Sequence, residues 1–181
     1  MQLSFSNFTN MDNLDFYRML SRRYDSLYGA EQKRKLNLIK EKICFSGILL
    51  DVGCGTGIST GFWKETKLKI GVDSCVELLR IAKEKYPGCM FICAKAEALP
   101  FKDNSFDAII CLTALHNFDS AERSLAEMKR VGKNDASCVI SVLKKSKNFN
   151  KLVLLVEENF SSFDRLDDKH DLILLRKIKK N

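Results

Sequence analysis

Short apolar runs alternate with helix-compatible stretches through most of this 181-residue chain. The runs long enough for strands are at residues 48–50, 69–72, 90–93, 106–112 and 137–142, and the stretches between them that suit helices are at 58–65, 76–85 and 120–131. Strands that are apolar along their whole length predict a parallel sheet covered on both faces. Because crossovers between parallel strands are right-handed, we predict an open, doubly wound α/β sheet with helices on both faces.

The N-terminal region has a different pattern, because its apolar side chains follow helical spacing only. Residues 14–28 and 30–43 each predict a helix, and Gly29 is predicted to end the first of them. Neither helix has an accompanying strand. We therefore expect a single domain in which an N-terminal helical lid, residues 1–45, packs on a core formed by residues 46–181.

The tail adds one helix, predicted at 148–159, and a final strand, predicted at 172–178. Residues 167–170, Asp-Asp-Lys-His, are typical of a tight turn and directly precede that strand. A turn of this kind joins neighbouring strands of opposite direction, so we expect the last strand to be antiparallel.

The net charge of +7 is confined to the two ends of the chain. Residues 1–45 hold eight basic and five acidic side chains, residues 46–143 hold twelve of each, and residues 144–181 hold ten and six. If the ends meet on one side of the core, they form a face that attracts phosphate backbones. Solubility of a small domain explains the same charges equally well, so charge alone does not choose a partner.

The remaining composition points to a soluble protein of a reducing compartment. No apolar run approaches the roughly 20 residues of a membrane span, and residues 1–10 lack the features of a secretory signal. The seven cysteines are an odd number, contain no Cys-x-x-Cys pair, and lie in no zinc-site spacing with either histidine. We therefore expect a cytoplasmic protein with neither a structural disulfide nor a metal.

A glycine-rich loop joins the first predicted strand to the first helix of the sheet, in the segment Leu-Leu-Asp-Val-Gly-Cys-Gly-Thr-Gly at residues 49–57. Asp73 follows Gly53 by 20 residues, at the end of the second strand, where a carboxylate can accept from both hydroxyls of a ribose. The spacing is G-x-G-x-G, whereas a dinucleotide fingerprint needs a third glycine where Ile58 stands. Asp51 beside the loop would repel a pyrophosphate but suits a cationic amino group. The pattern therefore favours a nucleoside that carries an amino acid.

These residues resemble motif I of the class I S-adenosylmethionine-dependent methyltransferases. Further motifs of the family follow in the right order, at residues 71–73, 96–101, 103–107 and 112–116. The likeness covers about residues 47–131 and is greatest to the type 11 branch, which includes the ubiquinone and menaquinone methyltransferases. It implies a Rossmann-like, mostly parallel sheet of seven strands, whose last two strands the tail is long enough to supply. It also implies S-adenosyl-L-methionine as cofactor and S-adenosyl-L-homocysteine as product.

The resemblance also implies which residues contact the cofactor: Asp51, Gly53, Cys54, Gly55, Asp73, Ser74, Ala96, Glu97 and Leu112. Asp51 would meet the methionine amino group, directly or through water, and Asp73 would hold the ribose hydroxyls. The two glycines would line the methionine and ribose, Ser74 would lie against the adenine, and the N–H of Ala96 would point to the adenine ring. Cys54 would pack beside the cofactor without acting as a nucleophile.

One position departs from the family pattern. Lys95 stands where an aspartate that accepts from the adenine amine is common. Either Glu97 or a backbone carbonyl takes over that function, or the cofactor is held less tightly.

Methyl transfer from a sulfonium needs alignment, exclusion of water and sometimes removal of a proton, so no strong catalytic constellation is expected. His116, just after the fourth strand, is the candidate catalytic residue; it would take a proton or orient the acceptor, or it would merely shape the pocket. Tyr17, Tyr24 and Tyr28 would roof the cofactor or pack between helices. The segment Thr-Ala-Leu-His at 113–116 lacks the Pro-Pro-aromatic motif of enzymes that methylate amide or exocyclic nitrogens.

Three functions remain open. The first is an active methyltransferase whose acceptor is RNA or protein, slightly favoured over a small metabolite because the lid is short and its flanks are basic. The second is a non-catalytic cofactor-binding subunit, or one that needs an activating partner. The third, a nicotinamide-dependent oxidoreductase, is disfavoured by Ile58.

Overall fold

The computed structural model describes residue 19 and residues 23–160 and 163–176. The helices and strands within these ranges are α2 (Tyr24–Lys40), β1 (Ile48–Val52), α3 (Ile58–Phe62), β2 (Leu68–Asp73), α4 (Val76–Lys85), β3 (Met90–Cys93), β4 (Phe106–Leu112), the 3₁₀ turn η3 (Leu115–Asn117), α5 (Ala121–Val131), β5 (Gly132–Leu143), α6 (Phe149–Asn159), β6 (Asp164–Asp167) and β7 (Asp171–Arg176).

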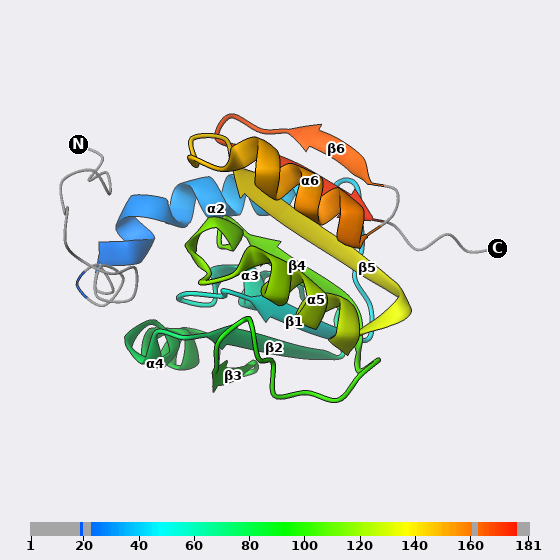
Figure 1. Cartoon of the computed structure of the whole chain (residues 1–181). Coiled ribbons are helices and arrows are strands. Elements are labelled where there is room, and N and C mark those ends of the chain that lie inside the picture. Colours follow the sequence, from blue (N-terminus) through cyan, green and yellow to red (C-terminus); the bar gives the residue numbers. More distant parts are fainter. Residues whose placement is uncertain (1–18, 20–22, 161–162, 177–181) are drawn as a thin grey trace.

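The strands form one seven-stranded sheet in the order β3-β2-β1-β4-β5-β7-β6 (Figure 1). Strands β1 to β5 pair in parallel, whereas β7 runs antiparallel to both β5 and β6. The prediction of a doubly wound, mostly parallel sheet with an antiparallel last strand is confirmed. The parallel pairing places the carboxyl ends of β1, β2, β3 and β4 along one edge, which is where ligands bind in such sheets.

Alternate residues of the central strands point to opposite faces of the sheet and build two separate hydrophobic clusters. In β4, Ile109 and Cys111 belong to the cluster covered by α5 and α6, whereas Ala108 and Ile110 belong to the cluster covered by α2 and α3. Figure 1 shows the first pair of helices in front of the sheet and the second pair behind it. Both faces of the sheet are therefore covered, as the unbroken apolar strands predict.

The expected helix boundary at Gly29 is wrong, because α2 continues through this residue from Tyr24 to Lys40. A glycine costs an exposed helix interior only about 1 kcal/mol relative to alanine, so neighbouring contacts outweigh it. Here α2 is anchored by Leu36 and Ile39, both fully buried against the sheet, and Gly29 itself lies buried beside Ile58 of α3. Tertiary packing therefore decides the course of this helix, and the division into a lid and a core stays a prediction.

None of the helices in the described part of the chain combines the length and the apolarity that a membrane crossing requires. All seven cysteines are free; Cys44 and Cys93 are exposed and the other five are buried.

Candidate functional site

The glycine-rich loop between β1 and α3 bends over the carboxyl end of β2. The N–H of Gly53 donates to Val72 O at 2.8 Å, which ties the loop to that strand. Gly53 has φ +74°, and a Cβ on it would lie 2.5 Å from the Cβ of Ala114. Gly57 has φ +78°, and a Cβ on it would lie 2.8 Å from the ring of Phe91. Both positions therefore require glycine, and the loop lies directly against the segment that follows β4.

Asp51 lies inside the sheet, near the carboxyl end of β1, which has β2 on one side and β4 on the other. Its side chain is 1% exposed, and the hydroxyls of Ser59 and Thr60 donate to Oδ2 at 2.5 and 2.6 Å. Oδ1 is buried and has no hydrogen-bond partner within the described residues. Burial raises the pKa of Asp51 to about 6, against the opposing effect of the two hydroxyls, and the nearby charge of Asp73 adds to the rise. The site thus presents a buried acceptor suited to a cation.

Asp73 stands at the end of β2 and directs its carboxylate to the glycine loop. Oδ2 accepts from the N–H of Gly55 at 2.8 Å, and Oδ1 accepts from the N–H of Cys75 at 2.9 Å. Burial raises the pKa of this carboxyl group, while these backbone donors lower it. Each carboxylate oxygen has two lone-pair sites, so one on each remains for a further donor. Such an arrangement suits two neighbouring hydroxyl groups.

Cys54 and Ser74, which the sequence also predicts to contact the cofactor, lie beside these two aspartates. The Cys54 side chain is buried, and a Cβ built on Gly71 would lie 2.8 Å from its Sγ. Burial raises the pKa of the Cys54 thiol well above its ordinary value, so the group stays protonated and is a poor nucleophile. Ser74 is exposed at the mouth of this edge, and its carbonyl oxygen lies 3.7 Å from Sγ of Cys93.

The loop after β3 contains Lys95, which stands where the family commonly has an adenine-binding aspartate. The ammonium group of Lys95 pairs with Asp119 at 2.7 Å, and both side chains are exposed. Oε1 of Glu97 accepts from the N–H of Ser120 at 3.1 Å, at the start of α5. This contact holds the Glu97 carboxylate at the helix terminus. Ala96, between them in sequence, is buried.

β4 ends at the buried Leu112, and the segment that follows it turns into η3, which carries His116. Burial lowers the pKa of His116, and nearby Lys35 lowers it further, while Asp171 raises it. Nδ1 of His116 is buried without a hydrogen-bond partner among the described residues. The ring is therefore a neutral imidazole near pH 7, as a proton acceptor must be.

Helix α2 contacts the glycine loop through its first turns. Asp25 accepts from the hydroxyl of Thr56 at 2.5 Å and also pairs with Lys85 of α4. Tyr28, on the next turn, is half-buried, and burial raises its pKa. Of the other tyrosines expected to roof the cofactor, Tyr17 and the side chain of Tyr24 lie outside the described residues.

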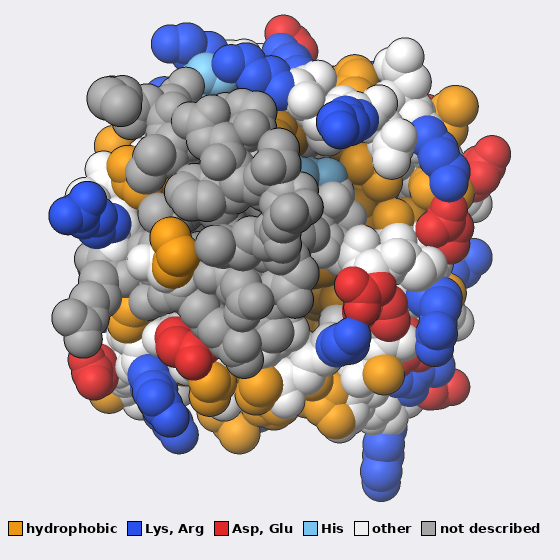
Figure 2. Space-filling view, turned by 60° about the vertical axis from the view of Figure 1, so that its left-hand side comes forward, with side chains coloured by type: hydrophobic (Ala, Val, Ile, Leu, Met, Phe, Trp, Pro, Cys, Tyr) orange, Lys and Arg blue, Asp and Glu red, His pale blue; other side chains and the backbone are white. Residues whose placement is uncertain are grey.

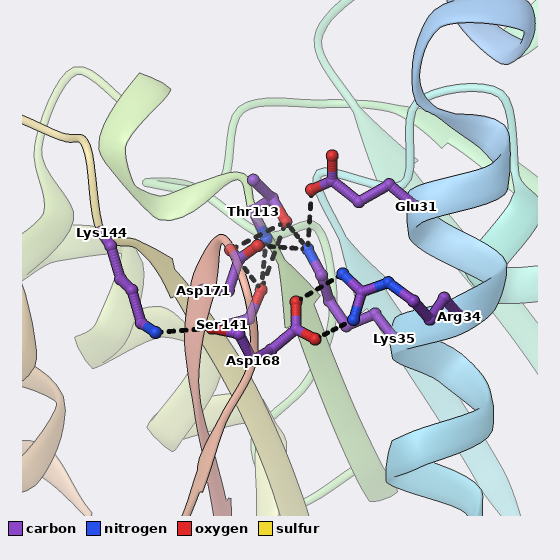
Figure 3. Close-up of polar contacts among 8 residues, drawn as sticks. All are labelled: Glu31, Arg34, Lys35, Thr113, Ser141, Lys144, Asp168 and Asp171. Atoms are coloured by element: carbon purple, nitrogen blue, oxygen red, sulfur yellow. Dashed lines mark hydrogen bonds and ion pairs between the residues drawn. The ribbon is translucent and has the colours of Figure 1, made fainter.

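A buried polar cluster beside the segment after β4 was not predicted from the sequence (Figure 3). Lys35 of α2 and Asp171 of β7 form an ion pair at 2.7 Å, and both side chains are fully buried. Thr113, directly after β4, and Ser141, in β5, form hydrogen bonds with this pair. The available signal was slight: Lys35 lies one turn before Ile39, on the buried face of its helix.

A family model for the methyltransferase domain matches residues 50–140, which is half of the chain. The chain therefore belongs to this family, the type 11 branch of the class I S-adenosylmethionine-dependent methyltransferases. Membership implies S-adenosyl-L-methionine as methyl donor and S-adenosyl-L-homocysteine as product. The branch inferred from the motifs is confirmed, and the nicotinamide alternative finds no support.

Among sequence relatives, an uncharacterized protein of Methanocaldococcus jannaschii is 34% identical over 130 residues, which are 71% of this chain and 50% of the relative. The demethylmenaquinone methyltransferase of Renibacterium salmoninarum is 37% identical over 94 residues, or 51% and 40% of the two chains. The chain thus spans half or less of the length of these relatives.

Solved structures share the fold at low sequence identity. A Thermotoga maritima protein, described as a SAM-dependent methyltransferase and possible histamine N-methyltransferase, aligns with a TM-score of 0.73 at 21% identity and covers 91% of this chain and 98% of its own. A chain of the complex between the Haloferax volcanii Trm112 methyltransferase activator and a methyltransferase aligns with a TM-score of 0.72 at 13% identity, covering 94% and 99%.

The residues at the carboxyl edge fit the cofactor chemistry. S-adenosylmethionine carries an ammonium group, and Asp51 Oδ1 is a buried acceptor without a partner among the described residues. Its ribose has two hydroxyls, and Asp73 keeps a lone pair on each oxygen. At Gly53 a side chain would be strained by the positive φ and would collide with Ala114, so the loop keeps its course over the carboxyl edge only with glycine. The individual contacts of the nine residues named from the sequence stay predictions.

Proposed function

We propose that this protein transfers the methyl group of S-adenosylmethionine to an acceptor nucleophile. The observation that carries the proposal is the buried Oδ1 of Asp51, which has no hydrogen-bond partner in the described part of the chain and lies beside a glycine loop to which Asp73 is hydrogen-bonded. A buried carboxylate is costly unless a cation or donor meets it, so the fold retains an energetic cost that a bound ammonium group would offset.

In this proposal the chain positions the reactants. Bound S-adenosylmethionine supplies a methyl group on a positively charged sulfur, which is already activated for in-line displacement. Asp51 holds the amino group, and Asp73 holds the ribose. Ala114 and Phe118 lie against Gly53, and in this proposal His116, which stands between them in sequence, faces the acceptor. The neutral imidazole then accepts a proton where the acceptor nucleophile carries one.

The acceptor we propose is RNA or protein. The positive charge of the chain ends supports a polyanionic or large partner. On the face in Figure 2, Lys and Arg side chains lie at several separate places with Asp and Glu between them, which supports modest electrostatic attraction only. A relative named for demethylmenaquinone supports the competing choice, a small hydrophobic acceptor.

A second candidate is a cofactor-binding subunit that transfers methyl groups only with an activating partner. Two observations favour it. A structural neighbour is part of a complex with the Trm112 activator, and Lys95 here pairs with Asp119 at the place where the family commonly has an adenine-binding aspartate.

Labelled cofactor distinguishes these functions. The protein is incubated with methyl-labelled S-adenosylmethionine and a cell extract, which is then separated into RNA, protein and small molecules. We expect label in the RNA or protein fraction, and no label with the Asp51→Ala variant. Label in the small-molecule fraction would overturn the acceptor class but not the transfer. Calorimetric binding of S-adenosylhomocysteine without label in any fraction would favour the partner-dependent subunit, and absence of both would contradict the proposal.

A further inference from the structure

The buried cluster in Figure 3 joins three parts of the chain that are distant in sequence. Lys35 comes from α2, Thr113 follows β4, and Asp171 begins β7. Nζ of Lys35 donates to Oγ1 of Thr113 and pairs with Oδ2 of Asp171 at 2.7 Å. Oδ1 of Asp171 accepts from the Thr113 hydroxyl at 3.1 Å. Ionic groups buried this deeply are expensive to desolvate, so the fold retains them against an energetic cost.

Thr113 sits in a backbone conformation that threonine rarely adopts. Its φ is +55°, in the left-handed region, where a β-branched side chain is strained. Lys35, Asp171 and Ser141 surround this residue: the N–H of Thr113 donates to Oγ of Ser141 at 2.8 Å, and its hydroxyl lies within reach of all three side chains. These contacts therefore hold Thr113 in a conformation that threonine does not favour on its own.

The strained residue stands at the start of the turn that closes the cofactor edge. A Cβ on Gly53 would meet Ala114 at 2.5 Å and the ring of Phe118 at 3.3 Å, so the residues on both sides of η3 pack on the glycine loop. His116, the candidate proton acceptor, lies between them. A change in the backbone at Thr113 would therefore shift residues that pack on the loop, and with them the imidazole.

We propose that Lys35 and Asp171 are positioning residues, which hold Thr113 in its left-handed conformation and thereby fix the turn 113–118 against the glycine loop. The proposal rests on the proposed function for its meaning, since this turn borders the candidate cofactor and acceptor sites. In this proposal, α2 and the hairpin formed by β6 and β7 shape the site through Thr113. Neither Lys35 nor Asp171 needs to touch the cofactor or the acceptor.

The main test replaces both charges, because, among the described side chains, removal of Lys35 alone would leave the Asp171 carboxylate buried without a cation, and removal of Asp171 alone would leave Lys35 with only the more distant Glu31, at 3.9 Å. Lys35→Met with Asp171→Val substitutes apolar side chains of comparable size. Two readouts are used on the full chain: hydrogen exchange of the peptide covering residues 113–118, and the calorimetric Kd for S-adenosylhomocysteine. We expect exchange in this peptide to quicken, and the Kd to rise, by roughly tenfold, because the strained turn is released.

Rescue by glycine tests whether the ion pair acts by holding the φ of Thr113 or only by stabilising the fold. Glycine adopts positive φ without strain, so adding Thr113→Gly to the double variant should restore exchange and Kd to within roughly twofold of wild type. In the wild-type background the same Thr113→Gly change removes hydroxyl contacts and should bring no improvement. Rescue in the double variant together with no improvement in the wild-type background is the expected signature.

The matched control is Arg34→Met. Arg34 also links α2 to the hairpin, through two hydrogen bonds to the Asp168 carboxylate, but none of its contacts in the described residues reaches Thr113. We expect unchanged exchange in 113–118. The proposal is overturned if Thr113→Gly has the same effect in both backgrounds, or if Arg34→Met loosens the turn equally. If wild-type protein fails to bind S-adenosylhomocysteine, the proposed function fails, while the exchange measurements still decide whether the pair holds the turn.

Discussion

Asp73 uses one carboxylate both to hold the glycine loop and, in our proposal, to bind the ribose. Asp73→Ala removes both functions, because the N–H groups of Gly55 and Cys75 lose their acceptor. Hydrogen bonds to a charged group contribute about 1.5–3 kcal/mol each. We expect S-adenosylhomocysteine to bind at least roughly a hundredfold more weakly, as measured by calorimetry.

Asp107→Ala is the control for this variant. Asp107 is also a carboxylate on the sheet that accepts from a backbone N–H, that of Ile48 at 2.8 Å, but it lies near the start of β4, at the opposite edge. This change should lower the stability and leave the affinity for S-adenosylhomocysteine within roughly twofold of wild type. Unchanged affinity in the Asp73 variant would contradict the ribose assignment.

If Asp51 binds the amino group as we propose, its titration makes cofactor binding depend on pH. Its pKa in the free protein is about 6, and an ammonium ligand would lower it, since opposite charge favours the ionised form. Binding then releases a proton below pH 6. We expect the affinity for S-adenosylhomocysteine to be constant above about pH 7 and to fall as the pH drops through 6, by up to roughly tenfold per pH unit. Calorimetry between pH 5 and 8 measures the profile.

The contribution of Asp51 to folding stability changes with pH in the opposite direction to that of a typical aspartate. Because burial raises the folded-state pKa of Asp51 above its ordinary 3.8, the free protein loses stability from this group as the pH rises from about 4 to about 6. Asp51→Asn should abolish both this loss and the step in affinity near pH 6. An affinity step that persists in the variant would assign the titration to another group.

At the scale of the element, α2 carries a helical glycine, Gly29, at which an added methyl group fits without a clash. A Cβ on Gly29 would lie 3.6 Å from Ile58 Cδ1 and 3.8 Å from Asp25 Cβ, which are ordinary contact distances. Alanine is also the better helix former, by about 1 kcal/mol. We expect Gly29→Ala to stabilise the protein by about 0.5–1 kcal/mol in urea denaturation.

Gly61 in α3 provides the opposite case. A Cβ there would collide with the ring of Tyr86, so Gly61→Ala should destabilise the protein despite the same gain in helix propensity. If both variants raised the urea midpoint, helix propensity rather than local space would decide the outcome.

At the scale of the whole molecule, the sheet was predictable because its signal is local and repeated. Each central strand is apolar on both faces, and each is followed by a helix, which together specify a doubly wound topology. The glycine loop and Asp73 were predictable because their spacing along one strand-loop-helix unit is itself the signal. The mistaken helix end at Gly29 came from reading a propensity where packing against Ile58 decides.

The polar cluster was not predictable for the opposite reason. Lys35 and Asp171 are far apart in the chain, and no sequence pattern around either residue indicates that it has a buried partner. Thr113 follows a strand like many other threonines, and no local rule indicates its positive φ. Such features arise only when α2, β4 and β7 have come together, so they belong to tertiary structure alone.

That dependence has a consequence for synthesis on the ribosome. Asp171 follows Thr113 by 58 residues, so β1 to β5 and the glycine loop are translated well before the carboxylate that pairs with Lys35. A nascent chain halted before residue 171 holds every motif of the family match, but of the described carboxylates its Lys35 has only Glu31, 3.9 Å away in the folded protein, and lacks Asp171, which lies at 2.7 Å. The hairpin of β6 and β7, which is translated after the strands that carry the motifs, is therefore the one that completes the turn beside the glycine loop.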